Sequence, residues 1–115
     1  MDQENIFEKE KPKTDIFFRG RVWNADRHGK CTGDGDYTMI VGSEYIWFSV
    51  YKTIPLYWVT EVEPVGPGFQ ITWKNDVNGE IIKNTFCIRK LFFHDEEKRD
   101  RIIQAIKLAK ERAEQ

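Results

Sequence analysis

The stretch YTMIVGSEYIWFSV, residues 37–50, decides the fold class. A Gly-Ser turn divides it, and its second half alternates between apolar side chains and others. That alternation is the period of a β-strand with one buried face. The stretch therefore predicts a tight β-hairpin, and the side chains expected to face inward on its second strand are those of Ile46, Phe48 and Val50.

Similar patterns on both sides of this hairpin predict five more strands. Runs rich in β-branched and aromatic residues are typical of strands, and turn residues separate them. The runs are residues 16–23, 54–56, 59–65, 69–74 and 81–90. Residues 24–36 contain three glycines and no apolar rhythm, so they predict a long loop. The inward positions predicted in the later strands are Val59, Val62, Phe69, Ile71, Trp73, Ile82, Phe86 and Ile88.

The period changes near the end of the chain. From Asp95 onward there is no Pro or Gly, and apolar residues recur at helical spacing. Asp95 is the expected N-cap of this helix. The apolar positions are Ile102, Ile103, Ile106, Ala109 and Ala113. Strands followed by one helix predict an α+β fold that is mainly β.

Length and composition limit the domain organisation. A chain of 115 residues is one domain. Residues 1–14 are polar and lack periodicity, which predicts a flexible N-terminal segment ahead of a domain over residues 15–115. The 18 Lys and Arg balance the 19 Asp and Glu, so bulk attraction to nucleic acid or to anionic membranes is not expected. Only a local cluster of charge would matter.

Three further features concern the location of the protein. No run reaches the ~20 apolar residues that a membrane helix needs. The first residues lack the apolar run of a secretory signal. Two cysteines do not make a disulfide framework, so Cys31 and Cys87 are expected to be free thiols. These observations together predict a cytoplasmic protein.

Three stretches carry a resemblance to a known family. YTMIVGSEYIWFS has apolar pairs around a short polar turn, IPLYWVTEVEP has spaced aliphatic residues, and an amphipathic helix closes the chain. Over residues 16–113 the chain resembles the pleckstrin-homology (PH) superfold, and most closely its GRAM and bacterial PH-like branches. It departs from them at Tyr45, where the GRAM hairpin commonly has a basic residue, and in a helix without tryptophan. The resemblance implies a seven-stranded, partly open antiparallel barrel capped by the helix.

The resemblance also implies a place for an anion. PH-like domains bind phosphoinositide headgroups at the end of the barrel where the first and third connections emerge. The basic residues of these connections here are Arg27, His28, Lys30 and Lys52. Cationic side chains around a phosphate form charge-assisted hydrogen bonds. The alternative is a solvated loop of mixed charge, because Asp26, Asp34 and Asp36 lie among them.

A second candidate site consists of aromatic side chains. Trp47, Tyr57 and Trp58 form a partner interface if they share an outer face of the sheet. The alternative is that other elements cover them, since aromatic residues usually bury large areas. Only Lys52 is a close basic neighbour in sequence, so an RNA-binding sheet is not expected.

The sequence gives weaker support for a metal site or a catalytic site. His28, Cys31, Cys87 and His94 are a legitimate zinc ligand set, but the ligands lack the short pairwise spacing of zinc sites. Cys31 and His28 also lack an orienting third group for nucleophilic catalysis. We therefore expect no cofactor, no metal and no enzyme activity. A small thiol or zinc protein stays as an alternative.

The sequence thus predicts a non-catalytic PH/GRAM-like binding or adaptor module. Its partner is expected to be a protein or a lipid headgroup at a membrane surface, and not a nucleic acid. The main alternative is a self-assembly module in which exposed aromatic residues join copies of the chain into a homo-oligomer.

Overall fold

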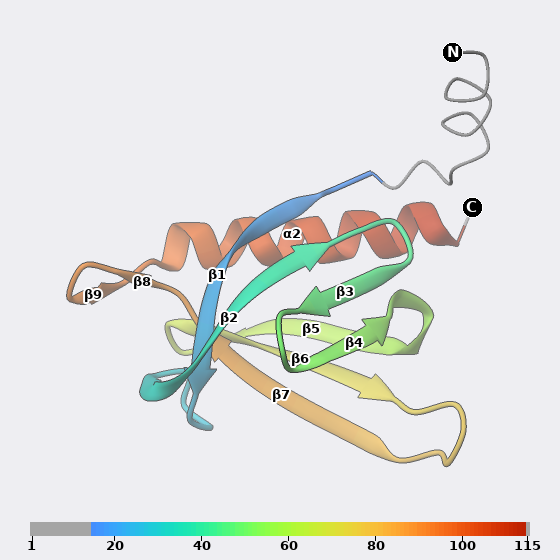
Figure 1. Ribbon diagram of the computed structural model, residues 1–115, viewed down its shortest axis with the longest axis horizontal. Helices are drawn as coiled ribbons and strands as arrows, with labels where there is room; N and C mark the ends of the chain where they lie inside the picture. Colours follow the sequence, from blue (N-terminus) through green and yellow to red (C-terminus); the bar gives the residue numbers. More distant parts are fainter. Residues whose placement is uncertain (1–14, 115) are drawn as a thin grey trace.

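The structure is a computed structural model that describes residues 15–114. They form a seven-stranded antiparallel sheet, a separate two-stranded hairpin and a C-terminal helix (Figure 1). The elements are β1 Phe18–Ala25, β2 Cys31–Val41, β3 Tyr45–Phe48, β4 Lys52–Pro55, the 3-10 turn η1 Leu56–Trp58, β5 Val59–Val65, β6 Gly68–Lys74, β7 Ile81–Cys87, β8 Arg89–Lys90, β9 Phe93–His94 and α2 Glu96–Ala113. The predicted flexible segment, residues 1–14, lies outside the described residues.

The strands follow one another as a meander in two halves. The order across the sheet is β4-β3-β2-β1-β7-β6-β5, so β1 pairs with both β2 and β7 and joins the halves. Within residues 15–114 no pairing connects the outer strands β4 and β5, so the sheet is curved but not closed. The predicted fold class is confirmed: mainly β, seven antiparallel strands, an open edge and one C-terminal helix.

The inner face of the sheet and one face of α2 share a single core. Figure 1 shows α2 running along one side of the curved sheet, and it packs against β5, β6, β2 and η1. Predicted inward residues confirmed as buried are Ile46, Phe48, Val59, Val62, Phe69, Ile71, Trp73, Phe86, Ile88, Ile102, Ile103, Ile106 and Ala109. Ile82 is half-buried and Ala113 is exposed. Asp95 caps the helix as predicted, because its side chain accepts a 3.0 Å hydrogen bond from the amide of Lys98.

The prediction of a long loop over residues 24–36 is wrong except at residues 26–30, because β1 extends to Ala25. The connection is a short turn, and β2 already begins at Cys31. Gly33 and Gly35 have positive φ angles of 92° and 66° within this strand. Glycine adopts such angles without steric cost. The ladder with β1 shifts register here, because Asp36 lies opposite Trp23 and Cys31 lies opposite Ala25, so residues 32–35 form a bulge opposite Asn24. Pairing with β1 on both sides of this bulge keeps the glycines within β2.

Val50 was expected to face inward with Ile46 and Phe48, and that expectation is wrong. β3 ends at Phe48, and Val50 lies in the β3–β4 turn with φ 47° and 99% of its surface exposed. The alternation stops because the chain reverses there.

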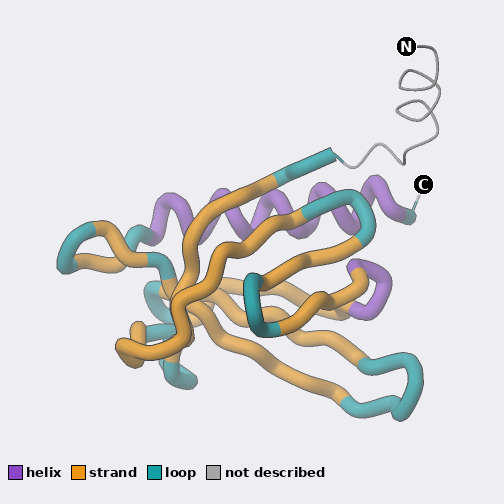
Figure 2. The backbone as a smooth tube through the Cα atoms, viewed as in Figure 1, coloured by secondary structure: helices purple, strands orange, loops and turns teal. Residues whose placement is uncertain are grey.

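The predicted single run of residues 81–90 also divides. β7 ends at Cys87, and β8 and β9 form a small hairpin that projects beyond the N-terminal end of α2 (Figure 1). Figure 2 shows the tip of this hairpin as a loop at one end of the molecule.

The cysteines are not free thiols as predicted, because Cys31 and Cys87 form a disulfide with their Cα atoms 5.6 Å apart. The sheet register explains the pairing. Cys31 lies opposite Ala25 at one end of β1, and Cys87 lies opposite Trp23 on the other side of the same strand. A separation of 56 residues in sequence hides this proximity.

Candidate functional site

The predicted basic residues Arg27, His28 and Lys30 share the turn between β1 and β2, and all three are exposed. Asp26 organises this turn: its Oδ1 accepts hydrogen bonds from the amides of His28 (2.8 Å) and Lys30 (3.0 Å). The hydrogen bond from the Lys30 amide is the main cause that lowers the pKa of Asp26 below its ordinary value. The carboxylate therefore stays charged inside the predicted anion site.

This turn packs against the turn between β5 and β6. A side-chain carbon at Gly29 would collide with the carbonyl oxygen of Val65, and one at Gly66 would collide with the carbonyl oxygen of His28. Arg99 of α2 holds the second turn, since its Nη1 lies 2.6 Å from the Gly66 oxygen. The basic turn is thus fixed against the β5–β6 turn by backbone contact.

Lys52, the fourth predicted basic residue, has other neighbours. Its Nζ lies 4.3 Å from the ring centroid of Tyr51 and 5.3 Å from that of Trp73. Arg27 in turn directs its Nε to the Nε2 of His28 at 3.2 Å. The structure thus brings three of the four predicted residues into one turn and places the Lys52 ammonium near the rings of Tyr51 and Trp73.

The predicted aromatic interface divides into exposed and packed members. Trp47 is exposed, and Tyr57 has 70% of its surface exposed. Trp58 instead stacks on Trp73, with ring centroids 5.8 Å apart and planes 10° from parallel, and it packs against the core. Trp58 therefore belongs to the packing beneath η1, and Trp47 and Tyr57 stay available to a partner.

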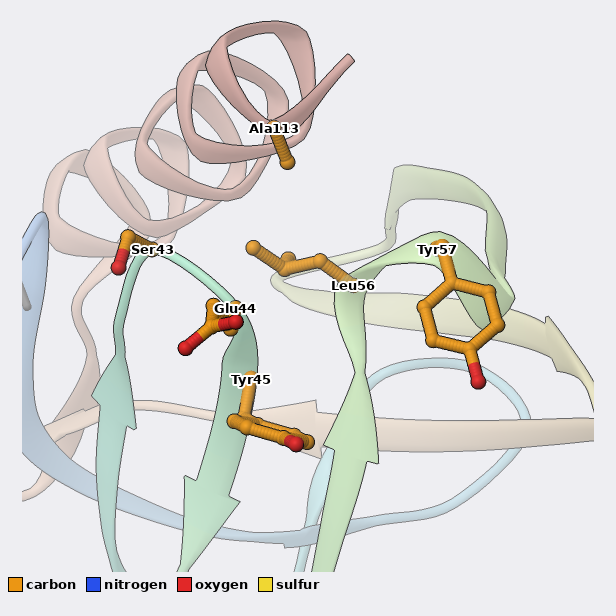
Figure 3. Close-up of a pocket in the computed structure, with 6 residues that line it drawn as sticks. All are labelled: Ser43, Glu44, Tyr45, Leu56, Tyr57 and Ala113. Carbon is orange, nitrogen blue, oxygen red and sulfur yellow. The ribbon is translucent and has the colours of Figure 1, made fainter. Parts of the chain in front are cut away.

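Glu44 and Tyr45 complete the exposed region, and neither was predicted to be part of a site. One hollow of about 270 Å³ is lined by Ser43, Glu44, Tyr45, Leu56, Tyr57 and Ala113 (Figure 3). A second hollow of similar volume is lined by Ile40, Gly42, Glu44, Tyr45, Trp47 and Thr53. Glu44 and Tyr45 line both, so the two hollows are neighbours. We call Glu44, Tyr45, Trp47 and Tyr57 the acidic-aromatic patch.

The backbone around the patch is held firmly, whereas the Glu44 carboxylate is not. The Glu44 carbonyl accepts the amide of Leu56 at 2.9 Å, and the Tyr45 carbonyl accepts that of Gly42 at 2.9 Å. The ion pairs among residues 15–114 do not include Glu44. Figure 3 shows its side chain between the β2–β3 turn and Tyr45, with Tyr57 beyond Leu56. An exposed carboxylate beside aromatic rings is suited to a cation.

A second surface that the sequence reasoning missed is the tip of the β8–β9 hairpin. Leu91, Phe92 and Phe93 have 84%, 91% and 74% of their surfaces exposed. The available signal was the run of three apolar residues between Arg89-Lys90 and the helix cap Asp95. The strand predicted over residues 81–90 includes the first half of the hairpin, so the sequence pattern does not reveal it.

The Cys31–Cys87 disulfide argues against the alternatives of a zinc site and a reactive thiol. The Cys31 amide donates a 3.2 Å hydrogen bond to Nε2 of His94, so one histidine does lie beside the cysteine pair. Both sulfur atoms are bonded to each other, however, and neither supplies a thiolate to a metal or a substrate. Residues 15–114 contain no cluster of three or more His, Cys, Asp or Glu side chains arranged to hold a metal ion.

No helix within residues 15–114 combines the length and the apolar character needed to span a bilayer. Comparison with known proteins adds no relative: no family model matches this chain, and no curated protein matches it.

Proposed function

We propose that this protein is a non-catalytic binding module that captures a basic segment of a partner protein on the acidic-aromatic patch. The observation that carries the proposal is the Glu44 carboxylate, which forms no ion pair within residues 15–114 and lies at the shared border of two hollows that aromatic side chains line. Lys or Arg is the side chain that both features attract.

The chemistry of the patch favours a cation over an anion or a neutral group. A carboxylate forms charge-assisted hydrogen bonds with an ammonium or guanidinium group. The faces of Tyr45, Trp47 and Tyr57 carry negative charge density, which adds a cation–π attraction of about 0.5–1 kcal/mol per exposed ring. Two adjacent hollows suit two neighbouring side chains of one extended segment. A partner with a short basic stretch therefore fits best.

The PH/GRAM-like character of the module is part of this proposal. It is supported by the meander of seven strands, the open edge and the helix that packs on the core. The headgroup site at Arg27, His28, Lys30 and Lys52 stays a prediction. It has less support than the patch, because Asp26 remains charged in the basic turn and Lys52 lies against Tyr51.

The expectations of no enzyme activity and of a cytoplasmic location also stay predictions. The prediction of a cytoplasmic location depended partly on free thiols, and the Cys31–Cys87 disulfide removes that argument. Disulfides persist mainly in oxidising compartments.

The test is an amide NMR titration of the full chain with a tetra-arginine peptide, and with a tetra-glutamate peptide as the charge control. We expect shifts for the amides of Glu44, Tyr45 and Tyr57 with the basic peptide only. Glu44→Gln removes the charge and keeps the shape, so it should weaken the binding about tenfold, as the loss of a charge-assisted hydrogen bond does.

A matched control is Glu61→Gln, which changes an exposed glutamate on β5. This variant should bind the peptide like the unchanged protein. Equal losses of peptide affinity in the Glu61 and Glu44 variants would mean that the peptide responds to the overall charge of the protein. The patch would then have no special role. Absence of shifts at Glu44 in the unchanged protein would also overturn the proposal.

A further inference from the structure

The tip of the β8–β9 hairpin is exposed in a way that the core does not explain. Leu91, Phe92 and Phe93 are contiguous, and all are at least 74% exposed. The two short strands of the hairpin are joined by two residue pairs, Arg89–His94 and Lys90–Phe93. It projects beyond α2 at one end of the molecule (Figure 1). Single exposed apolar residues are ordinary, but a contiguous group on a projecting tip marks a contact surface.

The backbone of the tip gives independent support. Leu91 has a positive φ of 57°, a conformation that is strained for a branched side chain and that glycine or asparagine adopts more easily. The Leu91 side chain gains no burial in return, since it is 84% exposed. Folding alone therefore gives no reason for leucine at this position.

Cationic side chains flank the tip. Arg89 and Lys90 precede it and are exposed. The hydrogen bond from the Cys31 amide to His94 joins the hairpin to the end of the β1–β2 turn, which carries Arg27 and Lys30 together with the Asp26 carboxylate. A net charge of −1 for the whole chain makes this local gathering of positive charge distinctive.

Carboxylates lie behind the tip, at the start of α2. Asp95 caps the helix, and Glu96 lies 3.6 Å from Arg99. Glu97 is exposed on the same helical turn. These charges oppose deep burial, so any apolar environment that receives the tip must be shallow.

We propose that Leu91, Phe92 and Phe93 insert into the interface of a membrane that contains anionic lipids, with Arg89 and Lys90 at the level of the headgroups. Aromatic residues partition into this interface, and basic side chains beside them are attracted to the negative surface potential. A protein partner is less suited to the tip, because a stable protein interface needs roughly 800 Å² from each side and three side chains on a narrow hairpin supply much less.

This inference goes beyond the proposed function and does not depend on it. The hairpin lies at one end of the molecule, and the β2–β3 turn and η1 lie toward the other end (Figure 1). One surface would hold the module on a membrane, and the other would remain free for a basic segment.

The test is co-sedimentation of the full chain with vesicles of phosphatidylcholine alone and with vesicles that contain about 30% phosphatidylserine. We expect weak, reversible binding that increases with phosphatidylserine. The double variant Phe92→Ser, Phe93→Ser should bind at least about tenfold more weakly, since two apolar side chains no longer leave water. Arg89→Ser and Lys90→Ser should each cost roughly fivefold on the anionic vesicles, and the loss should shrink at high salt.

Val50→Ser is the matched control. Val50 is also exposed and also has a positive φ, but it lies in the β3–β4 turn away from the hairpin. Its variant should sediment like the unchanged protein. All variants should unfold at the same temperature as the unchanged protein. The Phe92, Phe93 variant should also keep its NMR response to tetra-arginine, and this result separates the membrane proposal from the proposed function.

Three results would overturn the inference. One is no sedimentation of the unchanged protein with anionic vesicles. Another is undiminished sedimentation of the Phe92, Phe93 variant. The third is a dimer in light scattering that this variant converts to a monomer, because the tip would then contact a second copy of the chain.

Discussion

Nη1 of Arg99 lies 2.6 Å from the carbonyl oxygen of Gly66, and this hydrogen bond ties helix α2 to the β5–β6 turn. Nε of the same guanidinium lies 2.6 Å from Oδ1 of Asp100. Arg99 is the only buried charged residue among those described. The β5–β6 turn packs against the basic β1–β2 turn, so the Arg99 side chain connects α2 to both turns.

Arg99→Ala should lower the free energy of unfolding by about 2–4 kcal/mol, because it leaves the Gly66 carbonyl without its donor and removes buried packing. Urea unfolding measures this loss. Arg101→Ala is the control on the same helix: Arg101 is exposed, and its loss should change stability by less than about 0.5 kcal/mol. Equal effects of the two variants would show that the Arg99 contact does not hold the turn.

Gly29→Ala should destabilise the protein more than Gly33→Ala. Both glycines have positive φ, 82° and 92°, so alanine pays about 1 kcal/mol of backbone strain at either position. Only at Gly29 does the added carbon also collide with the Val65 carbonyl, whereas Gly33 has open space. We expect a further loss of about 1–3 kcal/mol for Gly29→Ala in thermal or urea unfolding. Matching losses would mean that the two turns do not touch in solution.

The Asp26 carboxyl should titrate below its ordinary pKa of 3.8, since the amides of Lys30 and His28 donate to it. A lowered pKa contributes stability above the unfolded value, and this contribution is lost as pH falls through the folded pKa. Carbon NMR of the side chain measures the pKa directly. Asp26→Asn keeps an acceptor oxygen without a titrating group, so unfolding of this variant should depend less on pH below about pH 4. A pKa at or above 3.8 would contradict the hydrogen-bonded turn.

The fold could be predicted from the sequence where its signals are local and agree. Period-two apolar residues in Phe69–Trp73 and period-3.6 residues from Ile102 to Ala109 each specify a buried face, and both faces are buried in the structure. The prediction failed where pairing with a distant strand decides the outcome. Gly33 and Gly35 signal a loop, but they lie in a bulge of β2 between two residues that pair with β1, Cys31 opposite Ala25 and Asp36 opposite Trp23.

The candidate sites could be predicted less well, because they depend on side-chain environments. Trp47, Tyr57 and Trp58 are alike in sequence, and only the stacking of Trp58 on Trp73 separates the packed ring from the exposed ones. Glu44 carries no motif, and the role that we propose for it rests on the two hollows that it lines together with Tyr45. Such relationships arise between elements that no local pattern connects.

The Cys31–Cys87 disulfide should be the largest single constraint on the unfolded chain. It closes a loop with a sequence separation of 56, which the chain-entropy relation values at about 4 kcal/mol. Cys31→Ala with Cys87→Ala should therefore lower the free energy of unfolding by about 2–4 kcal/mol in urea. A reductant should lower the stability of the unchanged protein to a similar extent.

The double alanine variant also serves as the control for the reductant, which should not destabilise it further. Partial proteolysis of the double alanine variant should cut the chain first at the junction of β1, β2 and β7. The disulfide joins the strands there, since Cys31 and Cys87 lie on opposite sides of β1. If the reductant leaves the unchanged protein as stable as before, the two sulfur atoms are not joined in solution. The prediction of free thiols would then be correct, and a thiol or zinc site beside His94 would again be an alternative.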